Sequence, residues 1–312
     1  MLLAVVSWES FAQLTANGIF RGAAYGLLGA GFALILGVTG RFHFAYSLTY
    51  TLSAYMCFTF WDRVGLPFWP ASILGILVVS ASGPAIERFV YRPLAARAGA
   101  TALLAVFVAS LGIGIAGENM IRLLWSSSSQ AFYGPTQSVW TLWDGKITFL
   151  NFDIYQSVSA LALVLILAAV LRFTSLGRRI KATRVNPDLA TVIGIDAKAV
   201  YLIVFAIGSL FAAVAAFWYG LQFTVDPSIG QRPVIFAFVV AFLAGTASSP
   251  IRVFIAGIAV GLVEKWSSMF ISVRWTETVV FLLLLGYLVG KSLKGNRFIA
   301  SLRPHRLRPR TA

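Results

Sequence analysis

The sequence has little charge and almost no cysteine. Only 12% of its 312 residues are Asp, Glu, Lys or Arg, whereas 59% are hydrophobic and the mean hydropathy is +0.83. A soluble fold of this length cannot hide so much apolar surface, so we expect lipid to be the solvent for much of it. The single cysteine, Cys57, lies inside an apolar run, where it has no partner for a disulfide and no neighbours for a metal cluster.

Acidic residues and histidine are scarce as well. The chain has 11 Asp and Glu against 25 Lys and Arg, but the basic residues flank apolar runs, which favours lipid headgroups over nucleic acid as their partner. Its two histidines, His43 and His305, cannot form a zinc site or a convincing catalytic triad. The sequence also lacks a Gly-x-x-x-x-Gly-Lys-[Ser/Thr] phosphate loop, so it has no ATPase site of its own. We expect neither enzymatic activity nor a metal or other cofactor.

Apolar runs recur along the chain at about the 20 residues that a membrane-spanning helix needs. Basic residues gather after the third run, between 172 and 184, and from 291 to 310, and these segments hold 15 of the 25 Lys and Arg. Loops rich in Lys and Arg stay in the cytoplasm. The loop at 126–153 has no basic excess and fits the outside.

This pattern predicts an all-α, polytopic transmembrane helical bundle of eight to nine spans, with its N-terminus outside and its C-terminus inside. The nine expected spans are 17–38, 42–62, 67–86, 101–125, 154–173, 199–219, 231–247, 253–272 and 276–293. The second and seventh are short or rich in polar residues, which is typical of broken or re-entrant helices. Residues 1–294 then form a transmembrane domain with a cytoplasmic loop at 174–196, and 295–312 form a basic cytoplasmic tail.

Small residues recur every four positions in the first expected span. This spacing is typical of close helix packing, and a glycine-lined path for a solute is the alternative; the residues are Gly18, Gly22, Gly26 and Ala30. A different cluster does not keep to one helical face, so local unwinding beside a translocation path is expected there; it comprises Gly112, Gly114 and Gly117.

Charged residues inside spans are costly, so each is a functional hypothesis. Glu118 and Arg122 are one turn apart and are expected to neutralise each other. Glu264 and Lys265 lie late in a span, from which they can reach towards the headgroups. Arg21 has no acidic residue at i±3 or i±4, so it either extends to the outer interface or meets an anionic solute.

A short polar stretch on the cytoplasmic side carries a complete set of helix signals. Asn186 suits the N-cap, Pro187 the first helical position and Asp188 the positive end of the dipole, while Gly194 suits the left-handed residue that ends a helix. Three apolar residues fall on one face of this helix, namely Leu189, Val192 and Ile193. That face is covered either by the protein's own spans or by a separate subunit.

Seven segments occur in an order that is shared by one family of transport proteins. They are 17–18 (NG), 86–94 (IERFVYRPL), 176–183 (LGRRIKAT), 186–190 (NPDLA), 194–196 (GID), 227–230 (PSIG) and 261–264 (GLVE). Together they resemble the branched-chain amino acid permeases of ABC transporters, and the likeness is greatest to the LivH type.

The resemblance implies a membrane-spanning permease subunit of an ABC importer in the bacterial inner membrane. Such a permease pairs with a second, homologous permease subunit, two cytoplasmic ABC ATPases and a periplasmic solute-binding protein. The short cytoplasmic helix matches the place where the family's permeases contact their ATPases. The residues that the resemblance assigns to ATPase coupling are Arg178, Arg179, Asn186, Pro187, Asp188, Leu189, Val192, Ile193 and Gly194.

The departures from the family pattern concern the solute. Where the family usually ends its motif after the first span with Asn-Phe-Ala-His-Gly, residues 42–47 read FHFAYS, and the glycine-rich turn at 244–250 is thinned. Members of the family that the chain resembles carry branched-chain amino acids, urea and short amides, or aromatic and other carboxylic acids, and the resemblance leaves all of these solutes open. Candidates for the substrate path are Asn17, Gly18, Arg21, Gly22, Phe44, Tyr46, Ser47, Gly112 and Gly114. An ion-coupled secondary transporter is the alternative, but the few intramembrane carboxylates favour it less.

Overall fold

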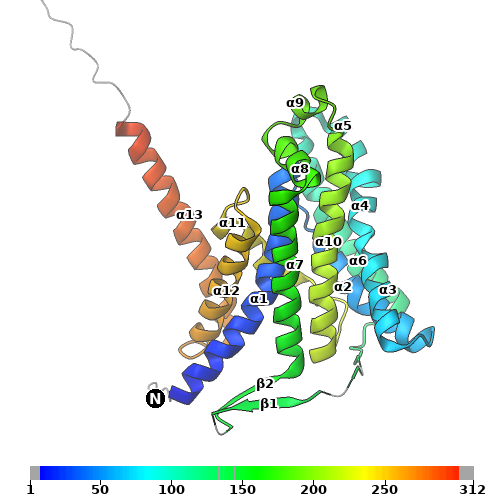
Figure 1. Cartoon of the computed structure of the whole chain (residues 1–312), viewed down its shortest axis with the longest axis vertical. Helices are drawn as coiled ribbons and strands as arrows, with labels where there is room; N and C mark the ends of the chain where they lie inside the picture. Colours follow the sequence, from blue (N-terminus) through cyan, green and yellow to red (C-terminus); the bar gives the residue numbers. More distant parts are fainter. Residues whose placement is uncertain (1–7, 133, 136, 144, 302–312) are drawn as a thin grey trace, which may run out of the picture.

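Helices α1 (Trp8–Thr39) and α10 (Ala197–Gln222) lie side by side and have more buried residues than any other helix of the described chain. The computed structural model describes residues 8–301 except 133, 136 and 144, and Figure 1 shows them as an upright bundle of helices with a small β-hairpin at one end. Helix α1 also contacts α7, α8, α11 and α12. Between Gly22 and Leu36 it is buried on almost every side, as expected of a helix that is apolar all round.

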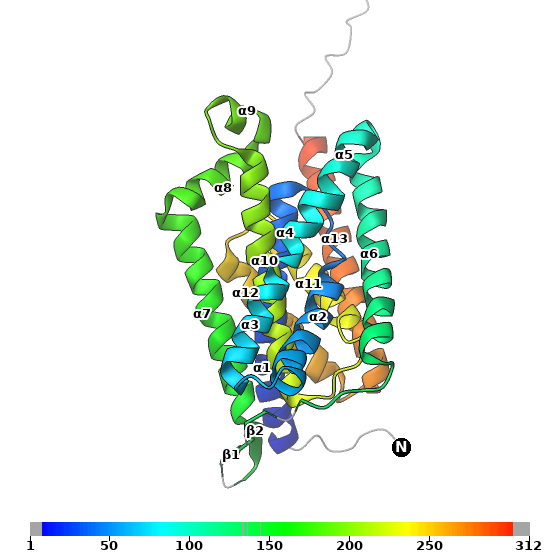
Figure 2. The same cartoon turned by 90° about the vertical axis from the view of Figure 1, so that its right-hand side faces the viewer.

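The remaining helices surround these two. They are α2 (Tyr46–Phe58), α3 (Phe68–Ser80), α4 (Ser82–Ile86), α5 (Arg92–Ala98), α6 (Ala102–Trp125), α7 (Asn151–Phe173), α8 (Ser175–Val185), α9 (Pro187–Val192), α11 (Gln231–Ala244), α12 (Pro250–Ser267) and α13 (Thr276–Ser301). Two π-helical turns, Thr59–Arg63 and Glu87–Tyr91, continue α2 and join α4 to α5. Helices α6 and α7 flank the bundle on opposite sides (Figure 2).

The hairpin consists of β1 (Val139–Leu142) and β2 (Ile147–Leu150), which pair antiparallel. It is fastened to the first turns of α1 by the Gln13 amide. Gln13 Nε2 donates to the Thr148 carbonyl and Gln13 Oε1 accepts from the Thr148 N–H, both at 2.7 Å. The expected outer loop at 126–153 therefore closes over the end of the bundle at which α1 begins.

The all-α prediction is confirmed for the described residues, in which β1 and β2 are the only named strands. Five helical segments in this part of the chain are long and apolar enough to cross a membrane, and the one at Phe68–Trp125 comprises α3 to α6. Helices α2 and α11 have 13 and 14 residues, about 20 Å each, against a hydrocarbon core of about 30 Å. These are the second and seventh expected spans. The total of eight to nine crossings stays a prediction.

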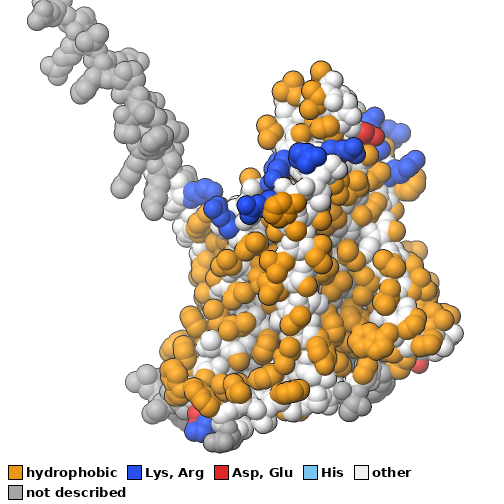
Figure 3. Space-filling view, viewed as in Figure 1, with side chains coloured by type: hydrophobic (Ala, Val, Ile, Leu, Met, Phe, Trp, Pro, Cys, Tyr) orange, Lys and Arg blue, Asp and Glu red, His pale blue; other side chains and the backbone are white. Residues whose placement is uncertain are grey.

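The outer surface of the bundle is apolar. Figure 3 shows hydrophobic side chains over most of the face that α7, α11 and α12 present, with Lys and Arg gathered in a band along its upper rim. Exposed Leu, Ile and Val side chains are numerous on α6, α7 and α13. Such a surface is stable only in lipid or against another protein, and the chain is accordingly a multi-pass membrane protein.

The two groups of loops that the charge rule separates lie at opposite ends of the bundle. Helices α5, α8 and α9 lie at the end opposite the hairpin (Figures 1 and 2). Arg92 donates to the Lys198 carbonyl at 3.1 Å and joins α5 to the first turn of α10 at that end. The arrangement agrees with the expected alternation of sides, and which end faces the cytoplasm remains a prediction.

The expectation of an unwound segment is wrong. No unwinding occurs at Gly112, Gly114 and Gly117, because α6 runs unbroken from Ala102 to Trp125. Gly114 and Gly117 instead allow α2 to approach α6: a Cβ at Gly114 would lie 3.0 Å from Ser47 Oγ, and one at Gly117 would lie 2.5 Å from a Leu48 methyl group. The expected basic tail at 295–312 begins as the last turns of α13, and from 302 onward it lies outside the described residues.

Candidate functional site

Arg21 lies inside the bundle, on the face of α1 that meets α10. Its guanidinium carbon lies 5.2 Å from the centre of the Phe223 ring. The side chain lines a cavity of about 220 Å³. The other walls are Ala24, Tyr25, Leu28, Tyr50, Gln156, Ala215, Tyr219, Asp226, Ser228, Ile229, Arg232 and Pro233. Arg21 therefore faces an internal cavity and does not extend to the headgroups.

A second cavity, of about 280 Å³, shares Arg21 and Gln156 with the first. It also takes in Leu150 of β2 and Asp153 in the first turn of α7, so it reaches the hairpin end of the bundle. Its remaining walls are Asn17, Phe20, Gln222, Phe223 and Lys265. Gln156, which lines both spaces, accepts a hydrogen bond from Gln222 at 3.2 Å. The two cavities together extend from the hairpin end towards the middle of the bundle, and we treat this stretch as the candidate route of a solute.

Fixed charge surrounds this route. Arg232, which lines the first cavity, makes ion pairs with Glu264 of α12 at 3.1 Å and with Glu277 of α13 at 2.6 Å. The Glu264 side chain is only 7% exposed, so it does not reach the headgroups as expected. Sequence reasoning missed this pair because the partners are 32 residues apart and belong to different helices. Asp226 is the acid of the first cavity, and it accepts hydrogen bonds from the backbone and hydroxyl of Ser228.

The glycine stripe of α1 holds the helices beside this route together. A Cβ at Gly22 would lie 2.6 Å from the Ile258 Cα, and one at Gly257 would lie 2.3 Å from the Gly26 Cα. Real Cβ atoms do not approach backbone so closely, so glycine on both sides lets α1 and α12 touch. The packing interpretation of the stripe is thus confirmed. Gly18 and Gly22 lie at this contact, whereas Asn17 and Arg21 face the second cavity.

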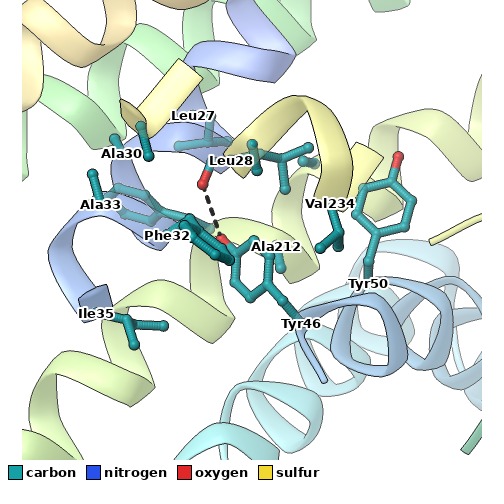
Figure 4. Close-up of a cluster of buried hydrophobic side chains, with 14 of the residues drawn as sticks. Leu27, Leu28, Ala30, Phe32, Ala33, Ile35, Tyr46, Tyr50, Ala212 and Val234 are labelled. Carbon is teal, nitrogen blue, oxygen red and sulfur yellow. Dashed lines mark hydrogen bonds between the residues drawn. The ribbon is translucent and has the colours of Figure 1, made fainter. Parts of the chain in front are cut away.

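Segment 42–47, which differs from the family pattern, supplies substrate-path candidates that lie outside these two cavities. The Tyr46 hydroxyl points towards Leu28 of α1, whose carbonyl lies 3.4 Å away (Figure 4). The Gly208 carbonyl of α10 lies 3.0 Å from the same hydroxyl, so the two carbonyls share its proton. Phe44 packs among aromatic rings, 5.6 Å from Phe107. These two side chains belong to the core, outside both cavities.

The other candidates of that group lie around α6. Ser47 and Gly114 line a small separate space of about 10 Å³ between α2 and α6, with Glu118 beside them. Gly112 has an exposed position, with nothing within 4 Å of an added Cβ. Glu118 and Arg122 form the expected i, i+4 ion pair, and Gln231 also donates to Glu118.

The short helix at the opposite end forms as expected. Asn186 Oδ1 accepts from the N–H groups of Asp188 and Leu189, both at 3.0 Å, and Gly194 has the left-handed φ of 85°. Its apolar face is uncovered within the described chain: Leu189, Val192 and Ile193 are 64%, 81% and 73% exposed. Arg178 and Arg179 lie on the preceding helix, α8, and are also exposed. The protein's own spans therefore do not cover this face.

The comparison with protein families agrees with this architecture. The sequence model of the family described as "Branched-chain amino acid transport system / permease component" matches residues 14–288. The chain belongs to this family. It is thus a membrane transport subunit of the ABC permease type, and as a member of a family of permeases without their own ATPase site it is not an enzyme.

Several curated relatives match along most of their length. The high-affinity branched-chain amino acid transport system permease proteins LivH of Salmonella typhimurium strain LT2 and of Escherichia coli K12 are each 28% identical over 291 residues, covering 88% of this chain and 92% of theirs. The corresponding protein BraD of Pseudomonas aeruginosa is 27% identical over 287 residues, with the same coverage. Among solved structures, PsaBC from Streptococcus pneumoniae in complex with Fab is 11% identical, with a TM-score of 0.47 and 88% of each chain covered.

Proposed function

We propose that this chain is one of two homologous permease subunits of an ATP-driven importer in the bacterial inner membrane. It passes a branched-chain amino acid, or a related small carboxylate, from a periplasmic binding protein to the cytoplasm. Two cytoplasmic ATPases supply the energy, because the chain has no phosphate loop of its own. The family match and the names of the relatives support the solute class and the kind of assembly.

The observation that carries the proposal is the position of Arg21. Its guanidinium lines both cavities, and in the described chain it makes no ion pair. Asp153 lines the second cavity with Arg21, and Glu264 is close enough to act on its charge, but neither forms an ion pair with it. An unpaired planar guanidinium binds a carboxylate well, through two parallel hydrogen bonds. The first cavity also offers the Asp226 carboxylate for an ammonium group, and Leu28 and Ile229 for an aliphatic side chain. A zwitterion with an apolar side chain matches these three features together.

The volumes of the two cavities also favour a small solute. Each of the two cavities, at about 220 and 280 Å³, lies below the ~300–1,000 Å³ of sites for drug-sized ligands. They suit a small solute that moves from one to the other past Gln156. The solute then passes Asn17 and Arg21 first, since both line the cavity nearer the hairpin end.

The ATPases dock on α9 in this proposal. An exposed apolar face on a well-capped helix outside the spans is typical of a surface that another protein covers. The residues that form the contact are those already named on α8 and α9, from Arg178 to Gly194. Only a contact that differs between ATPase states can shift the permease between two conformations, and a rigid helix at the end of α8 transmits such a difference.

Uptake of radiolabelled leucine tests the function, in cells that lack their own branched-chain importer and express this chain with its neighbouring transport genes. We expect uptake to stop when arsenate depletes ATP and to persist when an uncoupler collapses the proton gradient at constant ATP. The reverse pattern would identify an ion-coupled secondary transporter. Competition by valine, urea, short amides and aromatic acids then ranks the solute classes.

Arg21→Gln tests the cavity. The loss of a charge-assisted contact worth roughly 1.5–3 kcal/mol raises the solute concentration for half-maximal uptake about ten-fold or more, at an unchanged amount of protein in the membrane. Arg274→Gln is the matched control, because Arg274 is an exposed arginine outside both cavities, and its effect stays within about two-fold. Equal kinetics in the two variants would remove Arg21 from the solute path.

A further inference from the structure

A separate cavity of about 450 Å³ lies between α7, α8 and the start of α12, and it shares no lining residue with the two cavities beside Arg21. Three of its lining side chains are basic, namely Arg172, Lys181 and Arg184, and none is acidic. Apolar residues form much of the remaining wall, among them Leu171, Ile180 and Pro250. The cavity therefore combines concentrated positive charge with a hydrophobic lining.

Arg184 is the least satisfied member of the basic group. One guanidinium nitrogen donates to the Ala247 carbonyl at 3.3 Å, while Nε is buried with no hydrogen-bond partner among the described residues. Burial lowers the pKa of Arg184 below its ordinary value, and no acidic side chain in this part of the chain offsets that effect. A partly buried cation with a buried, unpaired donor is stabilised when an anion enters the cavity beside it.

The start of α12 adds to the attraction. This helix has 18 residues and begins at Pro250, with Ser249 as its N-cap. Ser248, Ser249 and Ile251 also line the cavity. The positive end of the helix dipole thus lies beside the same space as the three basic side chains.

The surroundings indicate a lipid as the source of the anion. In Figure 3 the band of Lys and Arg lies directly above the wide hydrophobic surface of the same face. Below the cavity, Leu165 and Ile166 of α7 and Ile255 of α12 are exposed, and α7 and α12 are in contact. We propose that this cavity binds the phosphate headgroup of an anionic phospholipid, whose acyl chains lie along the exposed apolar side chains of α7 and α12. Basic pockets between helices at a membrane face are a known form of such recognition.

A bound headgroup contacts α8 and the α11–α12 loop at once. Arg184 already joins these segments through the Ala247 carbonyl, and a phosphate shared by Arg184 and the first turn of α12 adds a second link. The lipid therefore stabilises the junction between α8, which leads into α9, and α12, which packs on α1. This inference does not depend on which solute is carried.

Binding is measured on the full-length chain in a neutral detergent, titrated with short-chain phosphatidylglycerol, short-chain phosphatidylcholine and inorganic phosphate. Arg172→Gln with Lys181→Gln removes two charges from the cavity and leaves the Arg184 contact intact. Arg178→Gln with Arg179→Gln removes two exposed charges from α8 outside the cavity and is the matched control. A third variant, Arg184→Lys, keeps the positive charge but replaces the planar guanidinium, with its several N–H donors, by a single ammonium group.

We expect phosphatidylglycerol to bind more tightly than phosphatidylcholine, and the cavity double variant to bind it about 25-fold more weakly, at about five-fold per charge. The control double variant stays within about two-fold, and Arg184→Lys binds more weakly than the unaltered chain. Equal weakening in both double variants would show a diffuse charge effect and overturn the site. Inorganic phosphate binding as tightly as phosphatidylglycerol would make it a site for a soluble anion and overturn the lipid assignment.

Discussion

The pair between Arg232 and Glu264 allows a stability prediction with a definite sign and size. Glu264 is buried at 7% side-chain exposure, and Arg232, at 47%, also reaches Glu277. Arg232→Gln removes the cation and leaves the Glu264 carboxylate buried and without its ion pair. Glu264→Gln removes the buried charge instead and leaves Arg232 paired with Glu277. The two single variants therefore have unequal costs, although they break the same contact.

The magnitudes follow from burial. Removing one partner of a buried ion pair costs roughly 3–5 kcal/mol, because the remaining charge is uncompensated. Glu264→Gln costs about 1–2 kcal/mol, close to an ordinary hydrogen bond. The double variant has no orphaned carboxylate, so we expect it to be more stable than Arg232→Gln alone. At about 2 °C per kcal/mol for a chain of this size, Arg232→Gln lowers the melting temperature by about 6–10 °C and Glu264→Gln by about 2–4 °C.

The assay is thermal unfolding of the purified protein in one detergent at one ionic strength. Arg122→Gln is the control, because Arg122 forms an exposed ion pair within one helix, a kind worth about 0.3–0.5 kcal/mol. The reasoning is refuted if Arg232→Gln is no more harmful than Arg122→Gln. It is also refuted if the double variant loses the sum of the two single losses, since that result would mean that the two charges do not interact.

Two further predictions concern orientation and ATPase coupling. In a Cys57-free background, a cysteine at Ser127 reacts with an impermeant thiol reagent in whole cells and one at Lys181 does not, because the basic loops stay in the cytoplasm; labelling at 181 would reverse the topology. Leu189→Asp places a charge in the proposed ATPase contact, costing roughly 2–5 kcal/mol there, or about 30-fold or more in affinity. Because Leu189 is exposed in the chain alone, subunit stability stays unchanged while ATPase co-purification and solute-stimulated ATP hydrolysis are lost. Thr191→Asp is the control and is mild; ATPases retained by Leu189→Asp would exclude α9 as the coupling element.

Local signals in the sequence are enough to predict local structure. The cap at Asn186 and the left-handed Gly194 bound α9 as expected, because both depend on residues within one or two turns. The expected spans at 154–173 and 199–219 begin close to the starts of α7 and α10. The length of an apolar run in the sequence is close to the length of the helix that it forms. Helix α6 shows the limit of this reasoning: irregular glycine spacing indicated unwinding, but two of the three glycines serve contact with α2.

Pairs between helices could not be predicted, because they depend on which helices become neighbours. The ion pair between Arg232 and Glu264 joins α11 to α12. The cavities beside Arg21 are lined by residues from α1, α7, α10, α11 and α12. The only indication in the sequence was that Arg21 and Glu264 are charged residues inside apolar runs. For Arg21, the absence of a local acid was the informative part, because it left the guanidinium free to face a cavity.

The segment 86–94, which carried much of the resemblance, gains a physical explanation from one such pairing. Glu87 is fully buried and makes an ion pair with Arg41, while Tyr91 hydrogen-bonds His43 Nδ1 at 2.9 Å. The segment thus fastens the turn after α1 to the continuous helical segment formed by α3, α4 and α5. Tyr46, the first residue of α2, donates into the core. The departure at residues 42–47 therefore changes how this junction packs, and evidence about the solute is better sought at Arg21 and Asp226, which line the cavity itself.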